Sequence, residues 1–77
     1  MKEIKVLGPG CPRCEALARV TRQAADQLGI AYELEKITDI ARFADFGVMM
    51  TPGLVVNGEV KVQGKVPSLD ELKTMLG

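Results

Sequence analysis

The dipeptide Asn57-Gly58 separates two apolar stretches and limits the possible folds more than any other feature of this sequence. Both residues tolerate a positive φ angle, which the two-residue turns of tight β-hairpins require. We therefore predict that residues 54–56 and 59–63 form two antiparallel strands joined by this turn. The second half of the chain is accordingly expected to contribute a hairpin to a β-sheet.

The first half of the chain has the pattern of a strand, a helix and a second strand. Ile4, Val6 and Leu7 form a short apolar run that is followed by Gly-Pro-Gly at residues 8–10, which predicts a buried strand that ends in a tight loop. Apolar or small residues then recur at steps of three and four, as on one face of a helix. Residues 31–36 alternate as in a strand. This order and spacing favour a right-handed parallel βαβ unit.

Two more helices are predicted in the second half. Thr38 or Asp39 can cap a short helix over residues 40–46. Ser68 is followed three residues later by Glu71, the spacing of a capping box, which predicts the start of a last helix. The predicted order of elements is β-α-β-α-β-β-α, which is an α/β fold.

Length and composition exclude several classes of protein. The 77 residues contain no linker or repeat and predict one domain over residues 1–77. Ten basic and ten acidic residues cancel, which argues against nucleic acid and anionic membranes as partners. No apolar run approaches the roughly 18 residues that cross a bilayer, and the first residues lack the apolar core of a secretory signal. We therefore expect a cytoplasmic protein, in a compartment that keeps thiols reduced.

The two cysteines, Cys11 and Cys14, form a Cys-Pro-Arg-Cys motif at the predicted start of the first helix. With Cys11 at the N-cap, Pro12 occupies the first helical position, where its missing N–H would have had no partner in any case. The unpaired N–H groups of the first turn and the helix dipole both favour a thiolate at Cys11. Arg13 adds a positive charge, which Glu15 opposes weakly. Pro12 and Arg13 are therefore predicted to lower the pKa of Cys11.

These positions predict a dithiol that exchanges with disulfides. Cys11 sits at the loop end and is predicted to attack a substrate disulfide, which would give a mixed disulfide. Cys14 lies one turn later on the apolar face and is predicted to be the shielded, resolving thiol, whose attack would leave a Cys11–Cys14 disulfide. The sequence contains no histidine, so the usual general base is missing and the chemistry must come from sulfur. We expect no other cofactor and no metal.

Other interpretations of the cysteine pair stay open beside this one. A soft metal or metalloid would find two thiolate ligands, but a closed tetrahedral site would lack two more. A fixed structural disulfide is disfavoured by a reducing compartment and by the small loop that it would close. A chance pair of buried cysteines would leave a non-catalytic interaction domain. We favour redox chemistry because a CxxC motif beside a βαβ pattern is typical of it.

Thr51-Pro52 lies directly before the first strand of the hairpin. A trans proline at a strand start is the commoner interpretation, and a cis peptide bond is the rarer one. A cis bond would place the Thr51 backbone beside Cys11, where it could pair with an extended substrate strand. We therefore predict that Thr51 and Pro52 bind substrate. Met49 and Met50, just before them, are predicted to fill gaps in the core.

The Cys-Pro-Arg-Cys motif, Thr51-Pro52 and the terminal hairpin and helix follow one another as in thioredoxin-fold proteins of glutaredoxin size. The run from residue 32 to residue 72 resembles the small thioredoxin-like proteins known as redox-active disulfide proteins, and the resemblance covers nearly the whole chain. It implies a three-layer, thioredoxin-like fold whose four-stranded mixed sheet has the order 2-1-3-4, with three helices. It also implies a nucleophilic Cys11, a resolving Cys14 and a cis Pro52.

Two differences from the usual sequences of these families concern the groups that exchange protons and electrons with the cysteine pair. An ungapped count puts Lys5 where typical thioredoxins have a buried aspartate, so deprotonation of Cys14 is expected to rely on water or on Lys5. The Gly-Gly-acidic segment with which glutaredoxins help to hold glutathione is replaced here by Gln-Gly-Lys-Val at residues 63–66. The resemblance thus disfavours glutathione and favours a thioredoxin-reductase-like electron donor. We expect a monomeric reductase of protein disulfides.

Overall fold

A computed structural model of the protein describes residues 2–10 and 12–77. Its elements follow the predicted order, except that the helix predicted over residues 40–46 is α-helical only as far as Phe43 and continues as a 3₁₀ helix. In chain order they are β1 (Lys2–Leu7), α1 (Pro12–Leu28), β2 (Tyr32–Ile37), α2 (Ile40–Phe43), η1 (Ala44–Phe46), β3 (Gly53–Val56), β4 (Glu59–Gln63) and α3 (Leu69–Leu76). None of the helices in these described segments is long and apolar enough to span a membrane.

The four strands form one mixed sheet in the order β2-β1-β3-β4. β1 runs parallel to β2 and antiparallel to β3, and β3 runs antiparallel to β4. The parallel pair is joined through α1, since parallel neighbours need a crossover, whereas β3 and β4 are joined by the tight turn at Asn57 and Gly58. Asn57 has a φ of 51°, the positive value that such a turn requires. The predicted hairpin and the predicted sheet order are confirmed.

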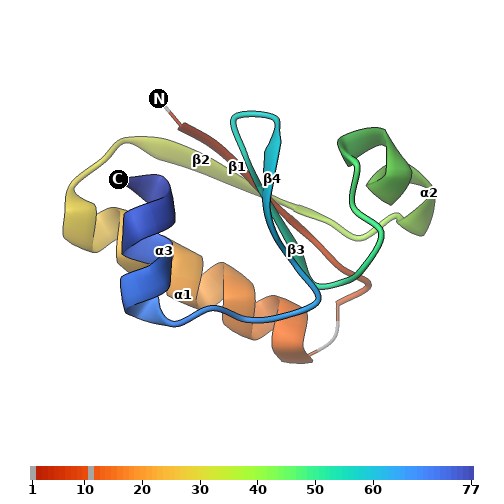
Figure 1. The fold of residues 1–77 in the computed structure, drawn as a ribbon, viewed down its shortest axis with the longest axis horizontal. Coiled ribbons are helices and arrows are strands. Elements are labelled where there is room, and N and C mark those ends of the chain that lie inside the picture. The colour runs from red at the N-terminus through yellow and green to blue at the C-terminus, as the bar shows by residue number, and fades with distance from the viewer. Residues whose placement is uncertain (1, 11) are drawn as a thin grey trace.

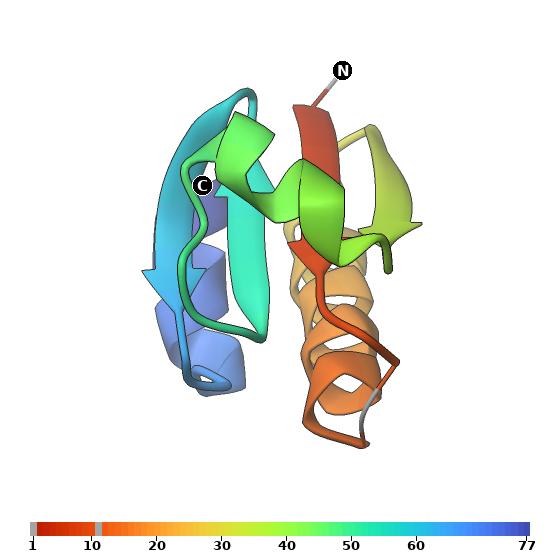
Figure 2. The ribbon, with the colours of Figure 1, turned by 90° about the vertical axis from the view of Figure 1, so that its right-hand side faces the viewer.

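Two helices cover one face of the sheet and a short helix lies on the other, which gives three layers (Figure 1, Figure 2). On the first face α1 and α3 pack against each other. Side chains alternate along β1, so that Ile4 and Val6 point to this face and are buried. The larger core consists of Ile4, Val6, Leu17, Ala18, Ala24, Ala25, Leu54, Val56, Val62, Leu72 and Leu76.

The second face is covered only where β1 and β2 end. Its smaller core, beneath α2, consists of Leu7, Ile37, Phe43, Val48 and Val55. Nearer the beginning of the two parallel strands the same face carries charged side chains, and Lys5 Nζ lies 3.0 Å from Glu35 Oε1. These side chains, with those of Glu3 and Glu33, line a hollow on β1 and β2. The two faces therefore differ both in area covered and in polarity.

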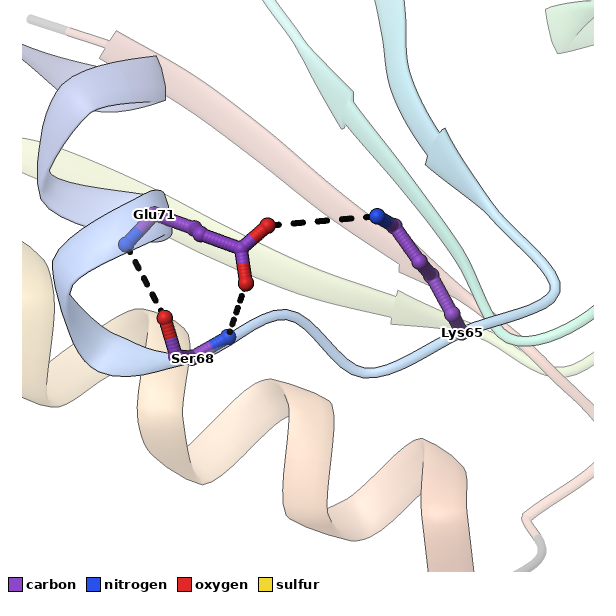
Figure 3. A network of polar contacts seen from close by, with 3 residues as sticks. All are labelled: Lys65, Ser68 and Glu71. Atoms are coloured by element: carbon purple, nitrogen blue, oxygen red, sulfur yellow. Dashed lines mark hydrogen bonds and ion pairs between the residues drawn. The ribbon is translucent and has the colours of Figure 1, made fainter.

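The last helix begins with the predicted capping box (Figure 3). The Glu71 N–H donates to Ser68 Oγ at 3.2 Å, and the Ser68 N–H donates to Glu71 Oε1 at 3.2 Å. The hydrogen bond from the Ser68 backbone, assisted by Lys65 at 3.9 Å, holds the pKa of Glu71 below its ordinary value. By contrast, α2 has a single cap, in which Asp39 Oδ1 accepts a hydrogen bond from the Ala41 N–H at 3.0 Å.

The prediction that Met49 and Met50 fill the core is wrong. Their side chains are exposed, Met49 to 91% and Met50 to 61%. The preceding residue, Val48, is 3% exposed and is the one that joins the smaller core. The chain then runs along the surface towards β3, so that Met49 points into solvent and Met50, which lies against Gly64, remains mostly exposed.

Candidate functional site

The sheet end at which β1 finishes and β3 begins brings together the segments that carry the predicted site. The last residue of β1 pairs with the first residue of β3, so that Gly8 and Pro52 extend the two strands from neighbouring positions. The loop after Gly8 leads into α1, whose first residue is Pro12. Cys11 lies outside the described residues, and its role as the attacking thiolate stays a prediction.

Cys14 is buried in the first turn of α1, with 5% of its surface exposed. Its sulfur lies against the backbone of Gly8, because a Cβ atom added at that glycine would stand 2.1 Å from Cys14 Sγ. Atoms that are not bonded do not approach so closely, and any side chain at position 8 would displace the cysteine. The sequence predicted only a loop-forming role for Gly8, since nothing in its immediate neighbourhood signals this contact.

A small cavity lies beside Cys14 and is flanked by a charged pair. The pair joins Lys36 Nζ to Glu15 Oε2 at 2.6 Å. This hydrogen bond and the charge of Lys36 hold the pKa of Glu15 below its ordinary value. The cavity is lined by Val6, Gly8, Gly10, Cys14, Glu15, Lys36 and Thr38. Lys36 thus offsets the negative charge of Glu15, which was expected to oppose a thiolate at the helix start. No local sequence signal reveals this ion pair.

The structure disfavours Lys5 as the group that assists the deprotonation of Cys14, and water stays as the predicted alternative. Lys5 alternates with the buried Ile4 and Val6, so its side chain points to the opposite face of the sheet from α1. There it pairs with Glu35 at 3.0 Å. The charged groups at the cavity beside Cys14 are instead Glu15 and Lys36.

Arg13 connects the start of α1 to the loop that follows β4. Its Nη2 atom donates a hydrogen bond to the carbonyl oxygen of Gly64 at 3.1 Å. The sequence predicted Arg13 only as a nearby positive charge, because a partner 51 positions away has no local signature. Its effect on the pKa of a cysteine stays a prediction.

The Thr51–Pro52 peptide bond is cis. Pro52 is fully buried, and its carbonyl oxygen accepts a hydrogen bond from the Gly64 N–H at 2.9 Å. Thr51 is half-buried. Gly64 therefore touches both Pro52 and Arg13, and so joins the segment before β3 to the first turn of α1.

The described part of the chain offers little for a metal ion. Within residues 2–10 and 12–77 no three His, Cys, Asp or Glu side chains gather closely enough to hold one. The chemically distinctive groups of the site are thus the buried Cys14, the Glu15–Lys36 pair and the backbone around Pro52.

Comparison with known proteins agrees with this arrangement. The sequence pattern of the family described as thioredoxin domain matches residues 2–77. A protein named thioredoxin from Methanothermobacter thermautotrophicus is 40% identical over 76 residues, which cover 99% of each chain. Another thioredoxin, from Methanocaldococcus jannaschii, is 36% identical over 76 residues, which cover 99% of this chain and 87% of the relative. With this sheet order and a match over almost its entire length, the chain belongs to the thioredoxin domain family.

Proposed function

We propose that this thiol-disulfide oxidoreductase of the thioredoxin family reduces protein disulfides, with Cys11 as the attacking thiolate and Cys14 as the resolving thiol. The observation that carries the proposal is the position of Cys14, which is buried one turn into α1 at the sheet end that also holds Pro52. A resolving thiol needs this combination, because it must be shielded from substrates yet close to the sulfur that meets them.

The proposed reaction transfers two electrons in two exchange steps. The Cys11 thiolate attacks one sulfur of the substrate disulfide, which breaks that S–S bond, forms a mixed disulfide and releases the other substrate sulfur as a thiolate. Cys14 then loses its proton and attacks the Cys11 sulfur. This second step forms the Cys11–Cys14 disulfide and releases the second substrate thiolate, and each released thiolate takes up a proton. The substrate is reduced and the protein is oxidised.

Several contacts support the assignment of the other residues. Pro12 begins α1, so that the unpaired N–H groups of the first turn and the helix dipole face the position before it. Both effects would stabilise a thiolate there. The half-buried Thr51 precedes the cis Pro52 at the same sheet end, where its backbone would pair with an extended segment of the substrate.

The proposal includes the regeneration of the dithiol. A thioredoxin-reductase-like donor would return two electrons to the Cys11–Cys14 disulfide, and no further cofactor is needed. Gln63, Gly64 and Lys65 stand where a glutathione-binding protein would carry its Gly-Gly-acidic segment, which disfavours glutathione as the donor. We propose a monomeric protein that works in the cytoplasm, where thiols are kept reduced.

Trapping of the mixed disulfide tests the two cysteine roles. Cys14→Ser should hold substrate proteins in a covalent complex that dithiothreitol releases, because the second exchange step is removed. Cys11→Ser should trap nothing and should not catalyse the reduction of insulin by dithiothreitol. Equal trapping by both variants, or full activity of Cys11→Ser, would show that the roles are assigned wrongly.

The direction of electron flow is tested by the reduction potential of the Cys11–Cys14 pair in a dithiol buffer. A reductase is expected near the roughly −270 mV of reducing thioredoxins, and an oxidant near the roughly −120 mV of strongly oxidising relatives. A value at the oxidising end would overturn the proposed reductase role while leaving the exchange chemistry intact.

A further inference from the structure

The side chain of Gln63, the last residue of β4, contacts the segment that leads to the cis proline. Gln63 Oε1 accepts two backbone hydrogen bonds, from the Met49 N–H at 2.7 Å and from the Met50 N–H at 3.3 Å. These are contacts between residues 13 and 14 positions apart in the chain. One carbonyl oxygen therefore fixes two consecutive peptide groups just before Thr51.

The next residue, Gly64, extends this connection in two directions. Its N–H donates to the carbonyl oxygen of Pro52 at 2.9 Å, and its own carbonyl oxygen accepts the hydrogen bond from Arg13 at 3.1 Å. Gln63 and Gly64 together thus hold residues 49–52 on one side and the first turn of α1 on the other.

Apolar burial does little to hold the middle of this segment. Val48 and Pro52 are buried at its two ends, but Met49 and Met50 between them are 91% and 61% exposed. Side chains that remain in solvent contribute little to fixing the backbone that bears them. Met50 lies against Gly64, but most of both methionine side chains stays in solvent, so the position of residues 49–50 depends largely on the two backbone hydrogen bonds that Gln63 accepts.

We propose that Gln63 is a positioning residue that holds residues 49–52 in the place where the backbone of Thr51 can meet a substrate. Gln63 is not among the residues that line the cavity beside Cys14, and its side chain bonds to the Met49 and Met50 amides, so we assign it to substrate binding and not to the sulfur chemistry. The inference rests on the proposed function, because it assigns the substrate to the Thr51-Pro52 segment. Its structural part, the holding of residues 49–50, can be measured without any substrate.

The structural part is tested by amide hydrogen exchange in three variants. Gln63→Leu removes the acceptor at similar side-chain length and should speed exchange at Met49 and Met50 by about tenfold. Gln63→Glu keeps an acceptor oxygen and should retain slow exchange. Lys61→Leu, on the same strand, replaces an exposed side chain whose ion pair is with Glu59, and should leave both amides unchanged.

The functional part is tested by the steady-state reduction of insulin with the same variants. For Gln63→Leu we expect KM to rise about five- to tenfold, with kcat and the reduction potential of the cysteine pair unchanged. Gln63→Glu should restore most of the binding, and Lys61→Leu should match the wild type. This split between KM and kcat would not arise from a general loss of stability.

Each contrary result overturns a named part of the proposal. Unchanged exchange at both amides in Gln63→Leu would show that Gln63 does not hold the segment, and faster exchange with an unchanged KM would show that holding it does not serve substrate binding. A changed reduction potential would show that Gln63 acts through the sulfurs. A wild-type protein that reduces no protein disulfide would count against the proposed function, and the exchange rates would then still decide whether Gln63 holds the segment.

Discussion

The two faces of the sheet are covered unequally. We expect the better covered face to contribute more to the stability of the fold, and the other face to tolerate change more easily. Two helices with a total of 25 residues, 17 in α1 and 8 in α3, close one face, whereas α2 on the other has four residues. The first face buries a continuous core between the helices, and the second buries a small cluster and leaves charged side chains on the strands. The cysteine-bearing turn of α1 belongs to the first, more rigidly packed face.

This comparison indicates what each face contributes. A helix packed against both a sheet and another helix cannot shift without opening a cavity, while a helix of one turn over a small cluster can move to fill one. We therefore expect the face of α1 and α3 to dominate the free energy of unfolding and to hold Cys14 in place. The α2 face should tolerate change at smaller cost.

The largest effect is expected from Leu72→Ala. Leu72 is fully buried in the larger core, between α3 and the sheet. The substitution should lower the free energy of unfolding by about 2–5 kcal/mol, measured by urea denaturation. A loss below about 1 kcal/mol would show that the larger core is as adjustable as the smaller one, and the comparison would fail.

Val56→Ala and Val55→Ala provide a matched test within one strand. These neighbours on β3 are buried to 3% and 1% exposure, but Val56 belongs to the larger core and Val55 to the smaller. We expect Val56→Ala to lower the free energy of unfolding by about 2–3 kcal/mol and Val55→Ala by about 1–2 kcal/mol, because α2 can relax towards the vacated space. Thermal or urea unfolding of both variants gives the difference, and a reversed order would contradict the assignment of rigidity to the larger core.

The N-caps of α3 and α2 are expected to give a smaller difference in the free energy of unfolding, again with the larger loss on the face of α1 and α3. Ser68→Ala removes the Oγ atom that accepts the Glu71 N–H in the capping box of α3, while the Ser68 N–H can still donate to Glu71, and Asp39→Ala removes the Oδ1 atom that accepts the Ala41 N–H at the four-residue α2. We expect losses of about 1 kcal/mol and about 0.5 kcal/mol respectively in the free energy of unfolding. Equal losses would indicate that the short α2 depends on its cap as strongly as α3 does.

The smallest effect on stability is expected from the protonation of two carboxylates, Glu15 and Glu71, at low pH. The pKa of Glu15 is lowered chiefly by Lys36, and that of Glu71 chiefly by Ser68. Because both folded-state values lie below the ordinary 4.5, the stabilisation is complete above that pH and is lost as the pH falls through the lowered values.

We accordingly expect Glu15→Gln/Glu71→Gln to show a flatter decline of urea midpoint than the wild type below about pH 4.5. The glutamine at position 71 retains an oxygen for the cap, so that the two proteins should differ mainly in this titration. Parallel declines would show that the two carboxylates do not contribute to acid sensitivity. Both are exposed to solvent, so the difference should be small.

Features that depend on neighbouring residues could be predicted from the sequence. The turn at Asn57, the capping box of Ser68 and Glu71 and the end of β1 before Gly8 each follow from rules that act within a few positions. The order of the sheet came from the family resemblance, since the pairing of β1 with β3 brings together residues far apart in the chain.

Contacts across the fold could not be predicted in the same way. The pairing of Lys36 with Glu15 joins residues 21 positions apart, and the hydrogen bond from Arg13 to Gly64 joins residues 51 apart. The exposure of Met49 was missed because side-chain type alone does not tell which of three consecutive apolar residues turns inward. The candidate site was therefore predicted as a set of residues, while the partners that hold them required the structure.

The close approach of Gly8 to Cys14 Sγ also has a consequence for how the sequence can change over time. A side chain at position 8 is incompatible with the sulfur, so we expect the two positions to be coupled in evolution although they lie six positions apart in the chain. Relatives that keep a cysteine at position 14 are expected to keep glycine at position 8, whereas relatives that have lost the sulfur are released from the closest of these contacts. The two positions, compared together, should distinguish family members that retain the reaction from those that retain only the fold.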